Sequence, residues 1–337
     1  MSKRGGIAVI IVLLILLGAG LYVLRQNTFD MTIQPVEIST PQGKLTGMLT
    51  LPENAAGSKP GLVLFIHGDG PVDASHNDGY KPLWERLASL GYASLSLNKR
   101  GINGSDGSWL EQSIEDRVEE ARQALAWARA QPFIDSGRIG VWGASQAGWV
   151  IPQLAAEEPL AFSILVSPAI NWQQQGAYNT RQQMMKDGYT AEEIAQRITY
   201  EQQVNELLQR GADYAQYTEM TDPGERMSAE RWSFVRRNFL ADAAGELHNF
   251  KTPVLLLLGE EDVNVDVEQT EQVYRGKIRP ASLLTVQRFP DTEHSMLPVR
   301  TADSPLRAFM ISLFAPRRIT VDGYMSAIES FLSKKSK

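Results

Sequence analysis

Short, continuous apolar runs alternate with helical signals along most of this chain, and this alternation constrains the fold more than any other feature of the sequence. Gly61–Ile66 reads GLVLFI, and residues 254–258 read VLLLL. Uninterrupted apolar runs of this length are typical of strands buried on both faces of a sheet. Further strands are predicted at residues 92–97, 138–142, 161–166 and 282–289, and helices at residues 84–91, 113–128, 146–156 and 324–332. Strands separated by helices indicate βαβ units, so the sequence predicts an α/β fold with a doubly wound, mainly parallel sheet.

Two segments depart from this alternation. Residues 31–52 read as a β-hairpin, because two strand-like runs flank the turn sequence TPQG. Residues 171–250 have no strong strand signal, but they contain the capping box TAEE, and Trp232, Val235 and Phe239 have the spacing of one helical face. Ligands of open α/β sheets bind beyond the carboxyl ends of the strands, so we predict a helical insertion that forms a lid over a substrate pocket. A surface elaboration with its own small core is the alternative.

Residues 1–25 read as a membrane anchor that precedes the folded domain, which we expect to span residues 31–337. Residues 5–24 carry no charge, and at 1.5 Å per residue a helix of that length crosses the roughly 30 Å hydrocarbon core of a bilayer. Lys3 and Arg4 favour a cytoplasmic N-terminus, which places the folded domain on the extracytoplasmic side of the cell (inner) membrane. The alternative is a signal peptide cleaved near its GAG sequence, which would leave a secreted or periplasmic protein.

Composition excludes several classes of function. The chain has 337 residues and a net charge of −6, so nothing indicates a nucleic-acid partner. Omitting Lys3, Arg4 and Arg25 takes that charge from −6 to −9, which suits a domain held near a membrane rather than one bound to anionic lipid. Cysteine is absent, which excludes a thiol nucleophile and thiolate metal sites, and neither HExxH nor GxxxxGK occurs. We therefore expect no metal site and no nucleotide site.

Ser145 is the candidate nucleophile. It lies in VWGASQAGW, between a predicted strand and a predicted helix. In the G-x-S-x-G elbow, a sharp strand-to-helix turn presents the serine Oγ at the edge of the sheet. Gly143 and Ala147 lie two residues to either side, where large side chains would clash across the turn. Alanine stands where the usual pattern has its second glycine, and an ordinary serine in a tight turn is the alternative.

A serine hydroxyl needs a positioned base to take its proton, and histidine is the usual one. The chain has four histidines, and we select His294 because it follows the last predicted strand, after the serine in chain order. His67 lies at the end of a buried strand, His76 in a polar loop and His248 at a strand entry. His294 is therefore the predicted general base.

The third member should be a carboxylate that orients the imidazole. Asp262 lies a tight turn beyond the strand predicted at residues 254–258, with Glu260, Glu261 and Asp266 as rivals. Asp291 is too close in sequence to His294 to be the usual orienting group, although it could brace the loop. The chain order of serine, aspartate and histidine is the one described for α/β-hydrolases.

The oxyanion hole is predicted from the HGDG sequence that follows the first long parallel strand. Glycines allow the backbone to bend so that an N–H group faces the site. We expect the backbone N–H groups of Asp69 and Gln146 to bind the developing oxyanion. A plain tight turn is the alternative reading of HGDG.

These pieces together resemble the α/β-hydrolase superfamily. The matching segments are IHGDGP, NKRGINGS, GASQAGW, GEED and the loop of His294. The resemblance extends from Met31 to the C-terminus, and within the superfamily the chain is similar to bacterial dienelactone-hydrolase-like and serine-aminopeptidase-like (prolyl-oligopeptidase-related) proteins. Relatives often carry D-x-R-G-x-G-x-S, where this chain has Asn98 and Asn103 at the first and sixth positions. The resemblance implies hydrolysis of esters, thioesters, lactones or small peptides through an acyl-enzyme, without a cofactor.

We therefore expect a serine hydrolase that cleaves a carboxylic ester of a small acyl substrate. An aminopeptidase-like peptidase or a thioesterase on the same fold is the alternative, and a non-catalytic binding module is a third reading. A peptidase of the amino-terminal type needs acidic groups for the substrate ammonium, and Glu192 with Glu193, or Asp222, are candidates. The presence of all three triad residues argues against the binding module.

Overall fold

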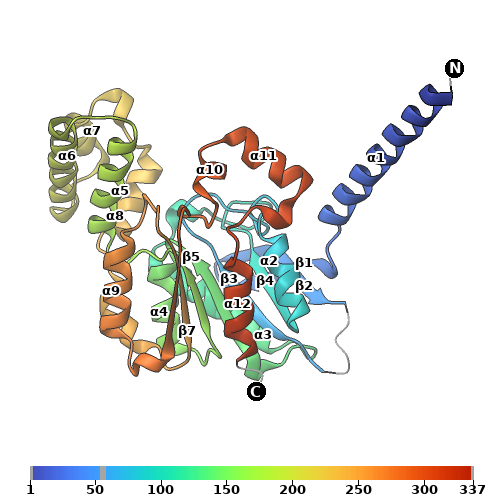
Figure 1. Ribbon diagram of the computed structural model, residues 1–337. Coiled ribbons are helices and arrows are strands. Elements are labelled where there is room, and N and C mark those ends of the chain that lie inside the picture. The colour runs from blue at the N-terminus through green and yellow to red at the C-terminus, as the bar shows by residue number, and fades with distance from the viewer. Residues whose placement is uncertain (1–2, 54–57, 335–337) are drawn as a thin grey trace.

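The computed structural model describes residues 3–53 and 58–334, and within these ranges eight strands form one sheet (Figure 1). The strand order is β1-β2-β4-β3-β5-β6-β7-β8. Strand β2 is antiparallel to both of its neighbours, and all other neighbouring strands are parallel. The predicted hairpin and the mainly parallel sheet are confirmed. The strands are β1 (Met31–Thr40), β2 (Gly43–Pro52), β3 (Gly61–Ile66), β4 (Tyr92–Leu97), β5 (Ile139–Ala144), β6 (Ser163–Val166), β7 (Val254–Gly259) and β8 (Leu284–Phe289).

The central strands are buried on both faces, which is why their sequences are apolar without alternation. In β3, the side chains of Leu62, Leu64 and Ile66 pack into one core, while those of Val63 and Phe65 pack into the core on the opposite face. Strand β7 divides its side chains between the two cores in the same way. Successive side chains of these strands therefore point to opposite faces of the sheet, although every residue in the run is apolar.

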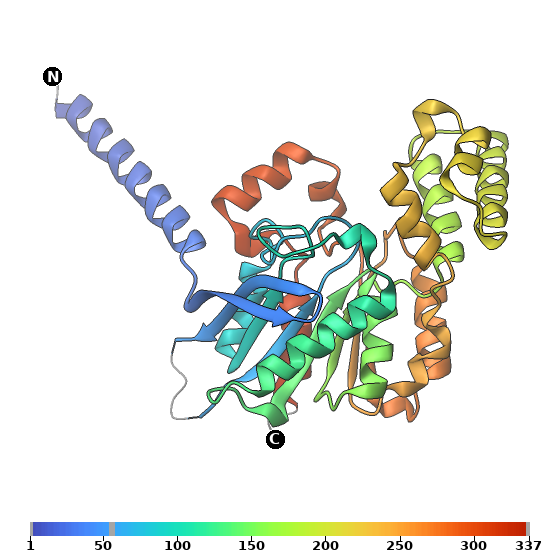
Figure 2. The same ribbon diagram turned by 180° about the vertical axis from the view of Figure 1, so that it is seen from behind.

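Helices cover both faces of the sheet (Figures 1 and 2). The helices on one face are α2 (Lys81–Ser89) and α12 (Tyr324–Ser333), and those on the other are α3 (Ile114–Arg129), α4 (Ala147–Glu157) and α9 (Val267–Lys277). The start of α3 is a capping box, because the Ser113 and Asp116 side chains each accept the backbone N–H of the other residue. These helices and strands give the doubly wound arrangement that the sequence predicts.

The segment 171–250 forms a separate group of helices beside the carboxyl edge of the sheet. Its helices are α5 (Trp172–Lys186), α6 (Ala191–Gln209), α7 (Tyr214–Met220) and α8 (Ala229–Asn238). Trp232, Val235 and Phe239 are buried in a small core of this segment, as their spacing predicts. Trp109, in the 3₁₀ turn Trp109–Glu111, packs against this core and connects it to the main domain. We call this segment the helical insertion.

Helix α1 (Lys3–Asn27) projects away from the domain, beyond the edge strand β1 (Figure 1). Its residues 10–27 are long enough and apolar enough to cross a membrane, by length and composition. Two helices lie between β8 and α12 that were not among the predicted elements, α10 (Val299–Ala302) and α11 (Pro305–Phe314). Figures 1 and 2 show α11 at the same end of the domain from which α1 extends.

Candidate active site

Ser145 occupies a strained turn between β5 and α4. Its φ angle is +55°, in the left-handed region that a residue with a Cβ rarely adopts. Two backbone hydrogen bonds hold this turn in place: the Ser145 N–H donates to Val166 O at 3.0 Å, and Ser145 O accepts from Ala169 N at 3.0 Å. Strain that is retained by surrounding hydrogen bonds is characteristic of functional sites. The turn has the geometry of the strand-to-helix elbow that the sequence suggested.

Small residues are required around this turn for two separate reasons. A Cβ on Gly143 would lie 2.6 Å from Ala147 Cβ, so these two positions face each other across the elbow. A Cβ on Gly148 would lie 2.4 Å from Ala169 O, because the loop after β6 passes directly over the start of α4. The turn therefore accommodates alanine at position 147 because position 143 is glycine. Gly148 is needed for the separate contact with the loop after β6.

His294 and Asp262 are joined by a hydrogen bond across two loops. The His294 Nδ1 atom lies 2.7 Å from Asp262 Oδ2, and the other carboxylate oxygen accepts the backbone N–H groups of Asn264 (2.7 Å) and Val265 (2.9 Å). Burial opposes the charged imidazole, but the hydrogen bond and charge of Asp262 outweigh it and raise the pKa of His294. Asp262 is thus a buried carboxylate whose oxygens are all engaged, one of them by the imidazole.

The close approach of these two loops depends on Gly259 at the end of β7. A Cβ there would lie 2.5 Å from Thr292 O, in the loop that carries His294. The rival carboxylates lie elsewhere: Glu260 and Glu261 are exposed, and Asp266 caps α9 by accepting the Gln269 N–H at 2.9 Å. Of the candidates, the structure brings Asp262 to the histidine.

The helical insertion braces the loop of Asp262. Three side chains on α5 donate to carbonyl groups of this loop: Tyr178 to Asp262 (3.1 Å), Asn179 to Val263 (3.1 Å) and Gln175 to Asn264 (3.1 Å). These contacts are about 85 residues apart in sequence, so no local pattern indicates them. The insertion therefore supports the position of the carboxylate.

The other histidines have different surroundings. His67 is buried, its Nε2 lies 2.7 Å from Leu97 O, and burial lowers its pKa to about 3. It is neutral at physiological pH and part of the core packing. His76 lies beside Tyr80 and lines a cavity that Ser145 and His294 also line, and burial lowers its pKa as well. His248 lies on the surface, where its Nδ1 donates to Gly245 O at 2.6 Å.

The backbone N–H groups of Asp69 and Gln146 both belong to residues that line the cavity beside Ser145. Among the residues that the structure describes, neither N–H group donates a hydrogen bond. Both are therefore available to an oxygen of a bound substrate. A Cβ on Gly68 would lie 3.2 Å from Ser145 Cβ, which shows how closely the HGDG loop approaches the serine.

Two buried basic side chains donate hydrogen bonds to the carbonyl groups of the HGDG loop. Lys99 donates from Nζ to Gly68 O at 2.6 Å, and Arg117 donates to His67 O and, at 2.7 Å, to Gln146 Oε1. Burial and the neighbouring Arg117 lower the pKa of Lys99 well below its usual range. Sequence reasoning missed both roles. Lys99 lies inside the recognised NKRGINGS segment, whereas Arg117 lies on the inner face of an otherwise ordinary amphipathic helix.

Arg231 of α8 forms a two-point ion pair with Asp69, with N–O distances of 2.7 and 3.1 Å. Burial opposes the charge on Asp69, but the hydrogen bonds and charge of Arg231 lower its pKa overall. The Arg231 guanidinium also lies over the rings of Trp109 and Phe234. The helical insertion and the HGDG loop are therefore directly connected.

Ser145 and His294 line the same cavity, which has a volume of about 780 Å³ and lies beyond the carboxyl ends of the central strands. The insertion contributes Trp172, Gln175 and Arg231 to its wall, and the segment after α11 contributes Ile319. The Ser145 hydroxyl makes no hydrogen bond among the described residues. In enzymes without bound substrate, the hydrogen bond between a nucleophile and its base is often long, and it tightens when substrate binds.

The acidic residues suggested for binding a substrate ammonium do not line this cavity. Glu193 caps α6 by accepting the Thr190 N–H at 2.8 Å, and Glu192 and Asp222 are exposed. Asp69 is the acidic side chain on the cavity wall in the described chain, and Arg231 occupies both of its oxygens.

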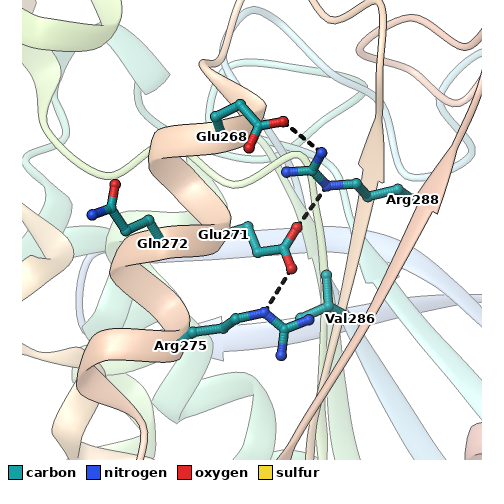
Figure 3. Close-up of a pocket in the computed structure, with 6 residues that line it drawn as sticks. All are labelled: Glu268, Glu271, Gln272, Arg275, Val286 and Arg288. Atoms are coloured by element: carbon teal, nitrogen blue, oxygen red, sulfur yellow. Dashed lines mark hydrogen bonds and ion pairs between the residues drawn. The ribbon is translucent and has the colours of Figure 1, made fainter.

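A second hollow, of about 500 Å³, lies between α9 and β8 and shares no residue with the active-site cavity (Figure 3). Arg288 bridges Glu268 and Glu271 there at 2.6 Å each, and Arg275 pairs with Glu271. The charges in this hollow satisfy one another, so it contains no group poised for chemistry.

Comparison with known proteins identifies relatives of this arrangement. A family model described as X-Pro dipeptidyl-peptidase (S15 family) matches residues 43–288. Dipeptidyl aminopeptidase BIII of Pseudoxanthomonas mexicana is 26% identical over 279 residues, which are 77% of this chain and 35% of that protein. The chain thus spans about a third of the length of this curated relative.

Solved structures share the fold. An esterase of Pyrococcus furiosus superposes with a TM-score of 0.56 at 20% identity, with 90% of this chain and 91% of that one covered. An acylaminoacyl peptidase of Pyrococcus horikoshii superposes with a TM-score of 0.55 at 15% identity, with 93% of this chain and 43% of that one covered. The fold is that of the α/β-hydrolases, as the sequence motifs implied.

Proposed function

The chain belongs to the X-Pro dipeptidyl-peptidase (S15) family and is a serine hydrolase of the α/β-hydrolase fold, and from this premise we propose that it cleaves short peptides through a Ser145–His294–Asp262 triad. The hydrogen bond between His294 and Asp262, in a loop pair beside the strained turn of Ser145, carries the proposal. Family membership and the curated relative favour a peptidase over the carboxylic ester hydrolase that the motifs alone suggested.

The reaction follows from the proposed roles. His294 Nε2 takes the proton of the Ser145 hydroxyl as Oγ attacks the scissile carbonyl carbon, and Asp262 stabilises the imidazolium. The carbonyl oxygen becomes an oxyanion, which the N–H groups of Asp69 and Gln146 bind. His294 then protonates the leaving amine, the C–N bond breaks, and an acyl-enzyme remains. Water, activated by His294, releases the acid and restores Ser145.

Labelling with a fluorophosphonate probe tests the nucleophile. The wild-type chain is expected to react, and Ser145→Ala is expected to lose the label. Ser89→Ala is a matched control, because Ser89 is exposed at the end of α2 and donates only to Arg86 O. Labelling that persists in Ser145→Ala would show that another residue is the nucleophile.

A substrate panel tests the peptidase proposal. Unblocked dipeptidyl anilides, the same compounds acetylated at the amino group, and phenyl esters of matched acyl size are compared by kcat/KM. The proposal expects the unblocked peptides to be cleaved fastest. Preference for the esters, with no peptide cleavage, would contradict it.

A carboxylic ester substrate is the second candidate, and one feature of the cavity favours it. The carboxylate of Asp69 is engaged by Arg231, so a free amino group of a peptide substrate would meet no unpaired acidic side chain on the described wall. The same panel decides between the two, because esters need no ammonium partner.

For localisation, we propose that α1 anchors the chain in the membrane with the catalytic domain on the extracytoplasmic side. The length and composition of residues 10–27 support this, as do Lys3 and Arg4 at the preceding end. An alkaline carbonate wash is expected to leave the full-length chain in the membrane fraction. Release of the intact chain by that wash would contradict an anchor, and a shortened soluble chain would indicate a cleaved signal peptide.

A further inference from the structure

Helix α11 presents an apolar stripe to its surroundings. Leu306, Phe309, Met310, Leu313 and Phe314 are 72%, 61%, 45%, 47% and 39% exposed. Their spacing of i, i+3, i+4, i+7 and i+8 places them on one face of the helix. Ala308 and Ile311, on the opposite side, are only partly exposed. A soluble surface rarely exposes a contiguous stripe of five large apolar side chains without a partner.

The stripe is attached to the base of α1. Asn27, the last residue of α1, donates from Nδ2 to Leu313 O at 3.0 Å. Arg317, in the turn after α11, donates to the carbonyl oxygens of Arg25, Gln26 and Thr28 at 2.7 Å each, and pairs with Glu85 of α2 at 2.6 Å. These bonds tie the end of α1 to both α11 and the main domain.

The apolar surfaces of α1 and α11 are therefore neighbours. The side chains from Ile10 to Leu17 on α1 are 51–64% exposed, and residues 10–27 have the length and composition to cross a bilayer. If α1 crosses the membrane, its hydrogen-bonded end brings α11 to the membrane surface (Figures 1 and 2). The bilayer that would surround α1 begins beside the end of α1 that is bonded to Leu313, so a lipid bilayer is the occupant that fits the stripe.

We propose that α11 docks into the interfacial region of the membrane that α1 crosses, with its apolar stripe among the upper acyl chains. Amphipathic helices of this kind lie in the plane of the interface with their apolar face about 5–10 Å deep. Arg300, Arg307 and Arg318 around α11 are exposed, and they line a hollow on the side of the helix away from the stripe. This proposal goes beyond the hydrolase activity and rests on the proposed role of α1.

Docking also places the cavity close to the interface. Ser312 lies on α11 itself and lines the active-site cavity, as do Ile319 and Thr320 in the segment that follows. The same short stretch of chain thus contributes to the cavity wall and to the exposed stripe. The opening of the active site would lie beside the headgroup layer.

Single nitroxide labels test the depth of α11 in the full-length chain. Because the chain has no cysteine, each introduced cysteine is the sole site for a thiol-specific nitroxide. The variants are Phe309→Cys on α11, Leu13→Cys on α1 and Phe133→Cys, whose position is 38% exposed near the amino ends of the strands. Each is reconstituted in phosphatidylcholine vesicles, and accessibility to oxygen is compared with accessibility to a water-soluble nickel complex.

The label at position 309 is expected to show an oxygen-to-nickel accessibility ratio severalfold above that at position 133 and below that at position 13. A ratio at 309 equal to that at 133, with the label at 13 inside the bilayer, would overturn the proposal while leaving the anchor intact. A water-exposed label at 13 would overturn both. Spin–spin broadening at 309, with shielding from both reagents, would show that a second copy of the chain covers the stripe instead.

A charge on the stripe provides a second measurement. Adding Leu306→Glu to the Phe309→Cys variant is expected to move the label at 309 toward the aqueous values. Leu240→Glu is the matched control, because Leu240 is 70% exposed but lies after α8 in the helical insertion. An equal shift from both substitutions would contradict docking through α11. Hydrolytic activity on a small soluble substrate is measured in parallel, so that failure of this proposal is distinguished from failure of the proposed function.

Discussion

Lys99 donates a hydrogen bond from Nζ to the carbonyl oxygen of Gly68 at 2.6 Å, and this single contact orients the next N–H group in the chain. The carbonyl of Gly68 and the N–H of Asp69 belong to one trans peptide unit, in which the two groups point in opposite directions. Holding the carbonyl from the side of Lys99 therefore turns the Asp69 N–H away from Lys99. Lys99 is a positioning residue for the proposed oxyanion hole.

Replacing Lys99 with methionine is expected to lower kcat by about 10- to 100-fold, because loss of one oxyanion donor costs about 10²–10³ in kcat and the donor here is misdirected rather than removed. KM should change little. Lys99→Gln, which keeps a donor, is expected to recover part of the rate. Steady-state kinetics on the three forms checks this, and a change confined to KM would contradict a role in the transition state.

Arg231→Gln is expected to lower kcat/KM severalfold while leaving the melting temperature within a few degrees of wild type. The ion pair with Asp69 is partly exposed, with side chains 31% and 40% accessible, and such pairs stabilise folded proteins by about 0–1 kcal/mol. Loss of this ion pair should instead change the position of the HGDG loop. Arg210→Gln, which breaks an exposed pair with Glu206 in α6, is the control. Equal effects of the two substitutions on kcat/KM would rule out a specific role for Arg231.

The pH dependence of kcat/KM should reflect the raised pKa of His294. The base must be neutral to accept the serine proton, so activity rises with pH through the pKa of His294. The midpoint of this rise, which is the acidic limb of the pH profile, should lie above the ordinary histidine pKa of 6.5. Asp262→Asn removes the charge that raises this pKa, so the limb should move to lower pH. The substitution should also lower kcat by up to about 10⁴ through loss of the correct tautomer. A limb that stays in place in Asp262→Asn would show that another group controls it.

Gly148→Ala is expected to destabilise the fold and to reduce activity, because the added Cβ would lie 2.4 Å from Ala169 O beside the elbow. Crowding of this kind costs about 1–3 kcal/mol. Gly276→Ala is the control: position 276 lies in α9 with no atom within 4 Å of the added Cβ, and replacing a helical glycine should stabilise by up to about 1 kcal/mol. Urea unfolding of both variants measures the difference, and a neutral Gly148→Ala would show that the loop after β6 can move aside.

The sequence by itself determined the features that depend on local order along the chain. The continuous apolar run of β3 identified a strand buried on both faces, and Ser113 with Asp116 identified the start of α3, because capping and periodicity involve residues a few positions apart. The elbow around Ser145 was recognisable for the same reason. Chain order singled out His294, and the position of Asp262 beyond the strand favoured it as the partner, although three other acidic residues near the end of β7 were rivals.

The tertiary structure decided what depends on distant contacts. Asp262 rather than Asp266 meets His294, because the tight turn after β7 and the close approach permitted by Gly259 place it there. The ion pair of Arg231 with Asp69 joins residues 162 positions apart, and nothing in either local sequence indicates it. The stripe on α11 was also missed, because an apolar helix face reads the same in sequence whether it is buried in a core or left exposed. Burial is a property of the assembled fold, so only the assembled fold distinguishes the two.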